Sequence, residues 1–136
     1  MRIFTDENVI ELRVLETGRE DFHVGIHIKA NGFTAHKDSI GISRAGFALF
    51  LEQLRTFKDL PEGEITLESM STGEFRLQFR AAGKRYHVVV QGHLNRTIYQ
   101  AESALLNTLY FAFRLDSSYL RTVVSEFEGL LGTDHS

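Results

Sequence analysis

Cysteine is absent from the 136-residue sequence, and proline occurs only once, as Pro61. The absence of cysteine excludes disulfide scaffolds, thiolate zinc sites, iron–sulfur clusters and cysteine nucleophiles. No proline-rich or serine-rich linker divides the chain, so we expect a single domain over residues 1–136, with residues 132–136 as a frayed tail. The stability of this domain must come from the packing of apolar side chains.

Long apolar runs and an excess of charge of one sign are also absent. The longest apolar run, Phe47 to Leu51, has five residues, whereas a membrane-spanning helix needs about 20. The N-terminus lacks the pattern of a signal peptide, so we expect a cytoplasmic protein without membrane contact. Fifteen basic and eighteen acidic residues give a net charge of −3, which argues against a nucleic-acid partner. Glycine-rich nucleotide-binding loops are missing, and we expect no cofactor.

Alternation of apolar and polar residues predicts two half-buried strands, near residues 10–15 and 22–30. The turn between them does not fix a register, so the pairing of these two strands stays open. Asn31-Gly32 then favours a two-residue type I′ hairpin, because both positions need a positive φ. The next strand, residues 33–40, should therefore fold back on its predecessor.

The middle of the chain alternates in three further segments, residues 65–67, 75–79 and 86–90. A loop at Ser71-Thr72-Gly73 predicts that Leu67 pairs with Leu77, with the glycine in the left-handed conformation. A two-residue loop at Ala82-Gly83 then predicts that Phe79 pairs with Tyr86. Both registers place the apolar side chains on one face of the sheet.

Two amphipathic helices are expected. Ser43 can cap the first helix, which should end near Asp59 because the following Pro61 disfavours helical angles before it. Residues 94–103 are expected to form a polar connection, followed by a last strand, and Asp116 should cap the C-terminal helix. The prediction is an α+β domain with a mostly antiparallel sheet of six or seven strands, one inserted helix and one C-terminal helix.

Histidine offers one candidate metal site. The expected hairpin places His27 directly opposite His36, where two imidazoles could hold Zn²⁺ with Asp38 as a diagonal neighbour. Two ligands do not make a structural zinc site, which normally needs four. The interpretation we favour is therefore a pair of solvated surface histidines.

A second candidate site is a basic cluster on the polar face of the central strands. It consists of Arg76, Arg80, Arg85 and His87, with Arg80 expected opposite Arg85, and could receive an acidic partner or a phosphate. Glutamates on the neighbouring strand would neutralise much of this charge. No arrangement of residues indicates a catalytic nucleophile, since Ser43 is better explained as a helix cap than as part of a nucleophile elbow.

Four segments together resemble the WapI-like immunity proteins of bacteria. They are Asn31-Gly32-Phe33, Phe50 to Leu54, Gly63 to Ser69, and Phe111 to Leu120, and their order and spacing cover residues 20 to 130. The resemblance implies a small protein that neutralises the toxic C-terminal domain of a large contact-dependent surface toxin. The family supplies no catalytic residues.

Three functional hypotheses follow. The leading one is a non-enzymatic interaction protein, an immunity protein that covers the active site of a toxin domain. The second is a ligand-binding or enzymatic domain with a pocket between the sheet and the inserted helix. The third is a homo-oligomer that pairs through a free sheet edge.

Overall fold

The computed structural model describes residues 1–83 and 87–132, which form eight strands, two α-helices and one 3₁₀ turn. In chain order these are β1 Arg2–Phe4, β2 Val9–Thr17, β3 Asp21–Ala30, β4 Phe33–Ser43, α1 Arg44–Asp59, β5 Glu64–Glu68, β6 Phe75–Ala81, β7 His87–Gln100, β8 Ser103–Asp116, the 3₁₀ turn Ser117–Tyr119 and α2 Leu120–Gly132. The predicted α+β class is confirmed. Of the predicted tail, Gly132 ends α2, and residues 133–136 lie outside the described part.

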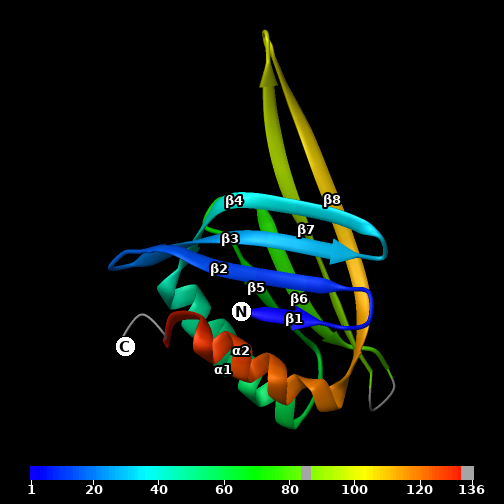
Figure 1. The fold of residues 1–136 in the computed structure, drawn as a ribbon. Coiled ribbons are helices and arrows are strands. Elements are labelled where there is room, and N and C mark those ends of the chain that lie inside the picture. The colour runs from blue at the N-terminus through cyan, green and yellow to red at the C-terminus, as the bar shows by residue number, and fades with distance from the viewer. Residues whose placement is uncertain (84–86, 133–136) are drawn as a thin grey trace.

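The strands form two sheets, not one. Each has four antiparallel strands, in the orders β1-β2-β3-β4 and β5-β6-β7-β8 (Figure 1). The prediction of one sheet with six or seven strands is therefore wrong. Alternation tells which face of a strand is buried, but two sheets that bury their faces in the same core give the same alternation as one.

The two helices lie side by side and close the space between the sheets (Figure 1). On α1, the ring of Phe47 contacts Phe22 of β3, with centroids 5.4 Å apart. One helical turn later the ring of Phe50 lies 6.3 Å from Phe79 of β6 and 5.0 Å from Phe127 of α2. One apolar stripe of α1 thus contacts both sheets and the second helix, which makes a single core.

In the first sheet, the expected Asn31-Gly32 hairpin is confirmed. Asn31 and Gly32 have φ of 53° and 87°, as a type I′ turn requires. The hairpin aligns His27 with His36. The pairing of β2 with β3, which the sequence did not fix, is antiparallel, with a register shift between Val14 and Glu16.

In the second sheet, one predicted register is confirmed and one is wrong. Leu67 pairs with Leu77, and Gly73 has a φ of 81°, as expected. Phe79, however, pairs with Val90 and not with Tyr86, because the connection between β6 and β7 is longer than two residues. The error is a shift of four residues, an even number, so the same side chains still face the core.

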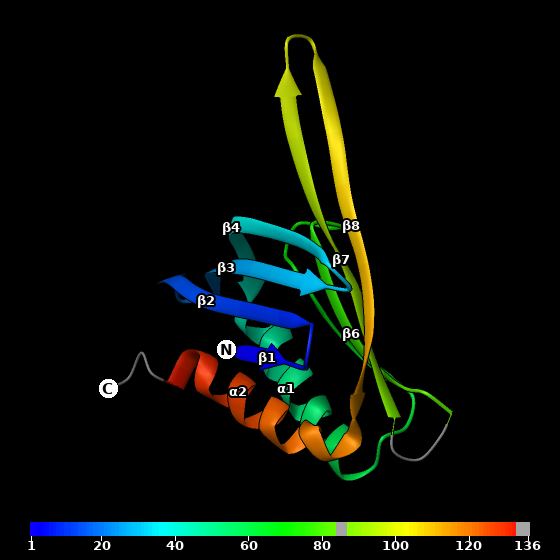
Figure 2. The ribbon, with the colours of Figure 1, turned by 45° about the vertical axis from the view of Figure 1, so that its right-hand side comes forward.

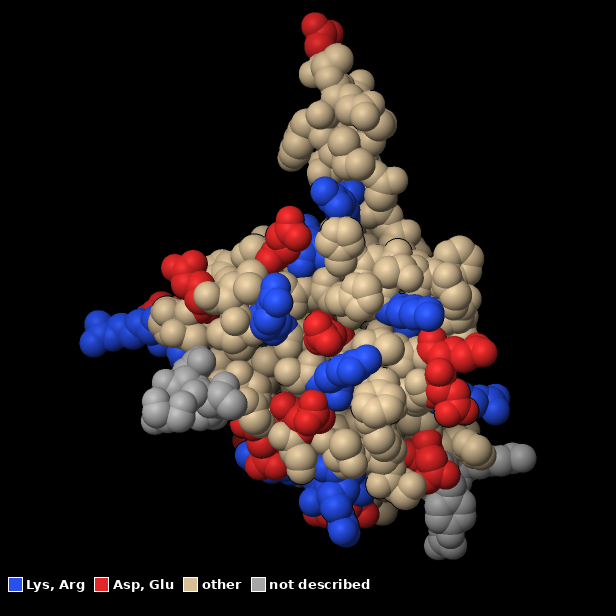
Figure 3. Space-filling view, in the orientation of Figure 1, with Lys and Arg blue, Asp and Glu red and all other residues tan. Residues whose placement is uncertain are grey.

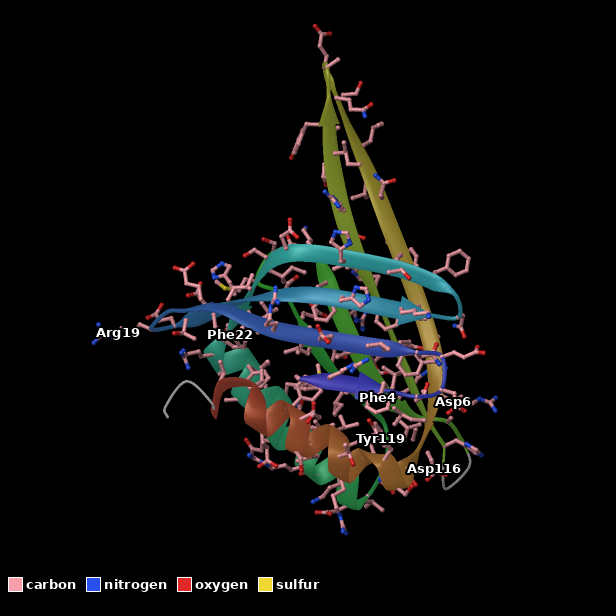
Figure 4. All side chains as sticks on the ribbon, in the orientation of Figure 1. Phe4, Asp6, Arg19, Phe22, Asp116 and Tyr119 are labelled. Atoms are coloured by element: carbon pink, nitrogen blue, oxygen red, sulfur yellow. The ribbon has the colours of Figure 1, made fainter. Side chains whose placement is uncertain are left out.

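The predicted cap at Ser43 is confirmed, and Asp116 caps the 3₁₀ turn before α2, not α2 itself. The Ser43 hydroxyl accepts a hydrogen bond of 3.1 Å from the backbone N–H of Gly46, and α1 ends at Asp59. Asp116 accepts one of 2.9 Å from the backbone N–H of Ser118 and so caps the 3₁₀ turn that leads into α2 (Figure 4). The backbone and hydroxyl hydrogen bonds from Ser118 lower the pKa of the Asp116 carboxyl.

The short strand β1 was not predicted and is held partly by the C-terminal elements. The backbone N–H of Arg2 donates to Glu126 Oε1 at 2.7 Å. The backbone N–H of Phe4 donates to the hydroxyl of Tyr119 at 3.4 Å, and both residues are labelled in Figure 4. Contacts of this kind join residues more than 100 positions apart, and a local sequence pattern does not reveal them.

Residues 94–103 do not form the expected polar connection. They continue β7 up to Gln100, turn back at Ala101 and Glu102, and enter β8. The two strands form a continuous ladder from His87–Asp116 to Gln100–Ser103, and its far half projects well beyond the body of the protein (Figure 2). We call this far half, residues 96–108, the arm.

Candidate interaction surface

The arm is exposed along its whole length. Every residue from Arg96 to Thr108 is exposed, whereas Leu94 at its root is buried. Within residues 1–83 and 87–132, the two arm strands pair only with each other. An isolated two-stranded ribbon is marginally stable in water, because nothing covers its faces or its outer edges. The arm is therefore a candidate surface for contact with another molecule.

Large apolar side chains lie on this exposed ribbon. Tyr99 is 81%, Leu106 65% and Tyr110 77% exposed. These three share the outer face of the ribbon, the face turned away from the core, as the alternation along the ladder requires. A buried tyrosine removes about 150–250 Å² from water, so the two rings alone present roughly 300 Å². The two rings do not form one contiguous patch, because Tyr99 pairs with Ala104 and Tyr110 lies six residues further along β8, about 20 Å away. Leu106 lies between them, so the three side chains form an exposed apolar row.

Charged side chains are scarce on the arm. Its 13 residues hold one cation, Arg96 at the root, and one anion, Glu102 in the turn. Figure 3 shows this distribution as a tan projection with blue near its root and red at its tip, in contrast to the mixed blue and red of the body. Depletion of charge together with exposed tyrosines is typical of the core of a protein–protein interface.

The root of the arm is joined to the first sheet by polar contacts. Lys37 of β4 forms an ion pair of 3.1 Å with Glu74 and donates to the carbonyl of Asn95 at 3.1 Å. The side-chain amide of Asn95 donates in turn to the carbonyl of Gly73. On the other strand, the Asn31 side chain donates to the carbonyl of Ala112 at 2.8 Å. Lys37 thus holds β7 where the arm leaves the body, and Asn31 holds β8 four residues nearer the body than Thr108.

Below the arm, the outer face of the second sheet carries a chain of side-chain hydrogen bonds. Arg80 Nε donates to Gln91 Oε1 at 3.2 Å, and Gln91 Nε2 donates to Gln78 Oε1 at 2.6 Å. Gln78 Nε2 donates to the Thr66 hydroxyl at 3.3 Å, which brings in the edge strand β5. This network links β5, β6 and β7. We call the polar surface formed by Thr66, Gln78, Arg80 and Gln91 and their neighbours on this outer face the platform.

The predicted basic cluster lies partly on this platform. Arg76 and Arg80 share the outer face of β6, and Arg76 forms an ion pair of 3.8 Å with Glu68, as the register predicted. His87 is opposite Asp116 at the start of the β7–β8 ladder. Arg80 pairs with Val89, so its predicted pairing with Arg85 is wrong, and Arg85 itself lies outside the described residues.

The predicted histidine pair lies on the outer face of the first sheet. The registers place Glu11, His27 and His36 in one row across β2, β3 and β4. Together with Arg13, Asp38 and neighbouring residues they line an open hollow of about 440 Å³. Among the residues that the structure describes, no group of three or more acidic or histidine side chains is placed to hold a metal ion. Zn²⁺ binding by the pair stays a prediction.

A groove also exists beside the inserted helix. It lies between α1 and β5, has a volume of about 370 Å³ and is lined by Leu49, Phe57, Leu60 and Ile65, with Glu52 and Glu62 among its polar residues. This is the place where the second functional hypothesis put a pocket.

The sequence contains a signal for the arm. Ile98 and Tyr99 are adjacent, and so are Leu105 and Leu106. In a strand, adjacent residues face opposite sides, so these pairs cannot both belong to the single apolar face that a half-buried strand shows.

Comparison with protein families supplies the assignment. A family model described as the immunity protein WapI-like family matches residues 1–133. The chain belongs to this family. The match begins at the first residue, so the WapI-like pattern includes β1 and β2, which the resemblance over residues 20 to 130 left out. The comparisons with curated proteins and with solved structures gave no match. No helix in the described part of this WapI-like chain is long and apolar enough to cross a membrane.

Proposed function

We propose that this chain is a non-enzymatic immunity protein that neutralises the toxic C-terminal domain of a large contact-dependent surface toxin. Membership of the WapI-like immunity protein family supports a toxin domain as the partner. The exposure of Tyr99 and Leu106 on the arm, and of Tyr110 two residues beyond it, supports the arm and its base as the place of contact. Aromatic side chains of this kind are enriched among the residues that carry most of the binding energy at interfaces.

The platform below the arm would supply the polar part of the same contact. Arg76, Arg80 and His87 lie on the outer face of the second sheet, the face that continues into Tyr110, Leu106 and Tyr99. An apolar centre flanked by hydrogen-bonding and charged groups is the usual composition of a protein interface.

The experiment is coexpression of the chain with the C-terminal toxin domain of the same strain, with growth as the readout. We expect the wild-type chain to restore growth and the double variant Tyr99→Ser/Leu106→Ser to protect poorly. The matched control is Leu49→Ser/Leu60→Ser, which also removes two apolar side chains that are more than half exposed, but from the groove beside α1. The variants should have the wild-type circular dichroism spectrum.

The outcomes separate the possible contact sites. Failure of the wild-type chain to protect would refute the immunity function. Loss of protection only in the Leu49→Ser/Leu60→Ser variant would place the contact in the groove and not on the arm.

A further inference from the structure

The arm is apolar on both faces, which is unusual for a surface ribbon. Ile98 and Leu105 are direct cross-strand partners on the face that continues the core side of the sheet, and they are 39% and 47% exposed. Tyr99 and Leu106 lie on the opposite face. A partner that docked flat against one face would leave the other apolar pair in water. The pattern therefore favours a partner that encloses the ribbon.

The dimensions of the arm suit enclosure. From Arg96 to Gln100 the strand rises about 3.4 Å per residue, so the arm reaches roughly 15 Å beyond the body. The ribbon is two strands wide, with about 4.8 Å between the strands. Figures 1 and 2, which differ by a turn of 45°, show it as a narrow projection in both views. Such an element fits a cleft better than it fits a flat surface.

The distribution of charge along the arm also favours enclosure by a partner. From Thr97 to Thr108 the only charged side chain is Glu102, in the turn at the tip. The uncharged strands of the arm can enter a cleft without the large free-energy cost of removing charged side chains from water. A carboxylate buried at the bottom of a cleft needs a cation or several hydrogen-bond donors opposite it.

We infer that the arm inserts into a cleft of the toxin domain, which covers both of its faces, and that Glu102 meets a cationic group at the bottom of that cleft. This inference rests on the proposed function, since the cleft belongs to the toxin domain. It explains both the two-sided apolar pattern and the single charge at the tip. Insertion of this kind would block a cleft physically, without any reaction catalysed by the chain.

Photo-crosslinking at adjacent positions tests the insertion. Benzoylphenylalanine is placed at Ile98, at Tyr99 or, as a control, at Leu49, and each variant is mixed with the purified toxin domain and irradiated. Positions 98 and 99 face opposite sides of the ribbon, so insertion predicts that both crosslink to the toxin domain and that position 49 does not. Circular dichroism checks that each variant is folded.

Other crosslinking results would overturn the insertion in different ways. Crosslinking at position 99 alone would indicate flat docking and would leave the immunity function intact. A complex that forms without crosslinks at 98 or 99 would remove the arm from the contact. Crosslinks between two copies of the chain, with none to the toxin domain, would identify a second copy as the occupant. Absence of any complex would refute the proposed function itself.

Charge reversal at the tip tests the contact of Glu102. We expect Glu102→Lys to weaken binding of the toxin domain by about tenfold or more, and Glu102→Gln to weaken it less. The control is Glu7→Lys, the same reversal at an exposed position in the turn before β2, which should change the affinity by less than about twofold. Wild-type affinity of the Glu102→Lys variant, measured by titration calorimetry, would exclude a cationic group at the bottom of the cleft.

Discussion

Gly92 of β7 lies between Leu77 of β6 and Phe111 of β8, four residues before the arm begins, and its replacement by alanine should destabilise the fold strongly. A Cβ atom at this position would lie 1.9 Å from the carbonyl oxygen of Arg76 and 3.0 Å from the ring of Phe111. Carbon–oxygen contacts normally begin near 3.3 Å, so the backbones of β6 and β7 would have to separate by roughly 1.4 Å. The added methyl group meets main-chain atoms, which cannot move away as a flexible side chain can.

The expected cost follows from the effect of overpacking. Inserting extra groups into a well-packed region costs about 1–3 kcal/mol, and the contact with backbone argues for the upper end, about 3 kcal/mol. For a chain of this size, about 3 kcal/mol lowers the melting temperature by roughly 10 °C. Urea unfolding followed by far-ultraviolet circular dichroism measures the loss as a lower midpoint at an unchanged m-value.

Gly129 of α2 provides the matched control. It is exposed, and a Cβ atom there would meet nothing within 4 Å. Gly129→Ala should therefore raise the free energy of unfolding by about 0.5–1 kcal/mol, because glycine is unfavourable inside a helix. Glycine-to-alanine substitution should thus lower the free energy of unfolding at position 92 and raise it at position 129. A Gly92→Ala variant within about 0.5 kcal/mol of wild type would refute the close approach of β6 and β7.

Three further predictions concern the cap, the pH dependence and the root of the arm. Ser43→Ala should lower the free energy of unfolding by about 1 kcal/mol in urea titrations, because the cap of α1 is lost. The pKa of Asp116 is lowered in the folded state, so the ionised carboxylate stabilises the fold above about pH 4, and this stabilisation is lost as the pH falls through the folded pKa. Asp116→Asn should therefore remove this part of the pH dependence of the free energy of unfolding, measured as urea midpoints between about pH 2 and 6. Lys37→Met should cost about 1–3 kcal/mol, because the half-buried Glu74 loses its ion-pair partner, and hydrogen exchange should show weaker protection at Asn95. Lys58→Met, whose ion pair with the well-exposed Asp59 should contribute little, is its control.

Much of the fold could be predicted because the body obeys simple alternation. The pairing of Leu67 with Leu77 and the turn at Asn31-Gly32 were correct, since in both places the turn residues and the apolar pattern agree. The predicted register of Phe79 was wrong because pairing with Tyr86 or with Val90, four residues later, buries the same face of the strand. The division into two sheets could not be predicted, because it depends on which residues α1 contacts across the core.

The arm could not be predicted as a strand pair for a more specific reason. Its sequence breaks the rule that a strand buries one face, since Ile98 and Tyr99 are both apolar and lie on opposite faces. Asn95, Arg96 and Gln100 also made this segment resemble a loop. The candidate site was therefore missed for the same reason that makes it a candidate, namely that its apolar side chains lie on both faces of the ribbon and are not covered by the chain itself.

The rigid root of the arm also bears on how tightly the arm can bind. A free ribbon would have to be ordered on binding, and each ordered side chain lowers the affinity. Here Lys37 and Asn95 hold β7 where the arm leaves the body, and Asn31 holds β8 four residues nearer the body. Gly92 allows β6 and β7 to approach closely. In the proposed complex, the root would orient the arm before binding, and most of the ordering cost would be met during folding. Substitutions at the root should consequently reduce affinity for the toxin domain even though none of these side chains lies in the exposed part of the arm.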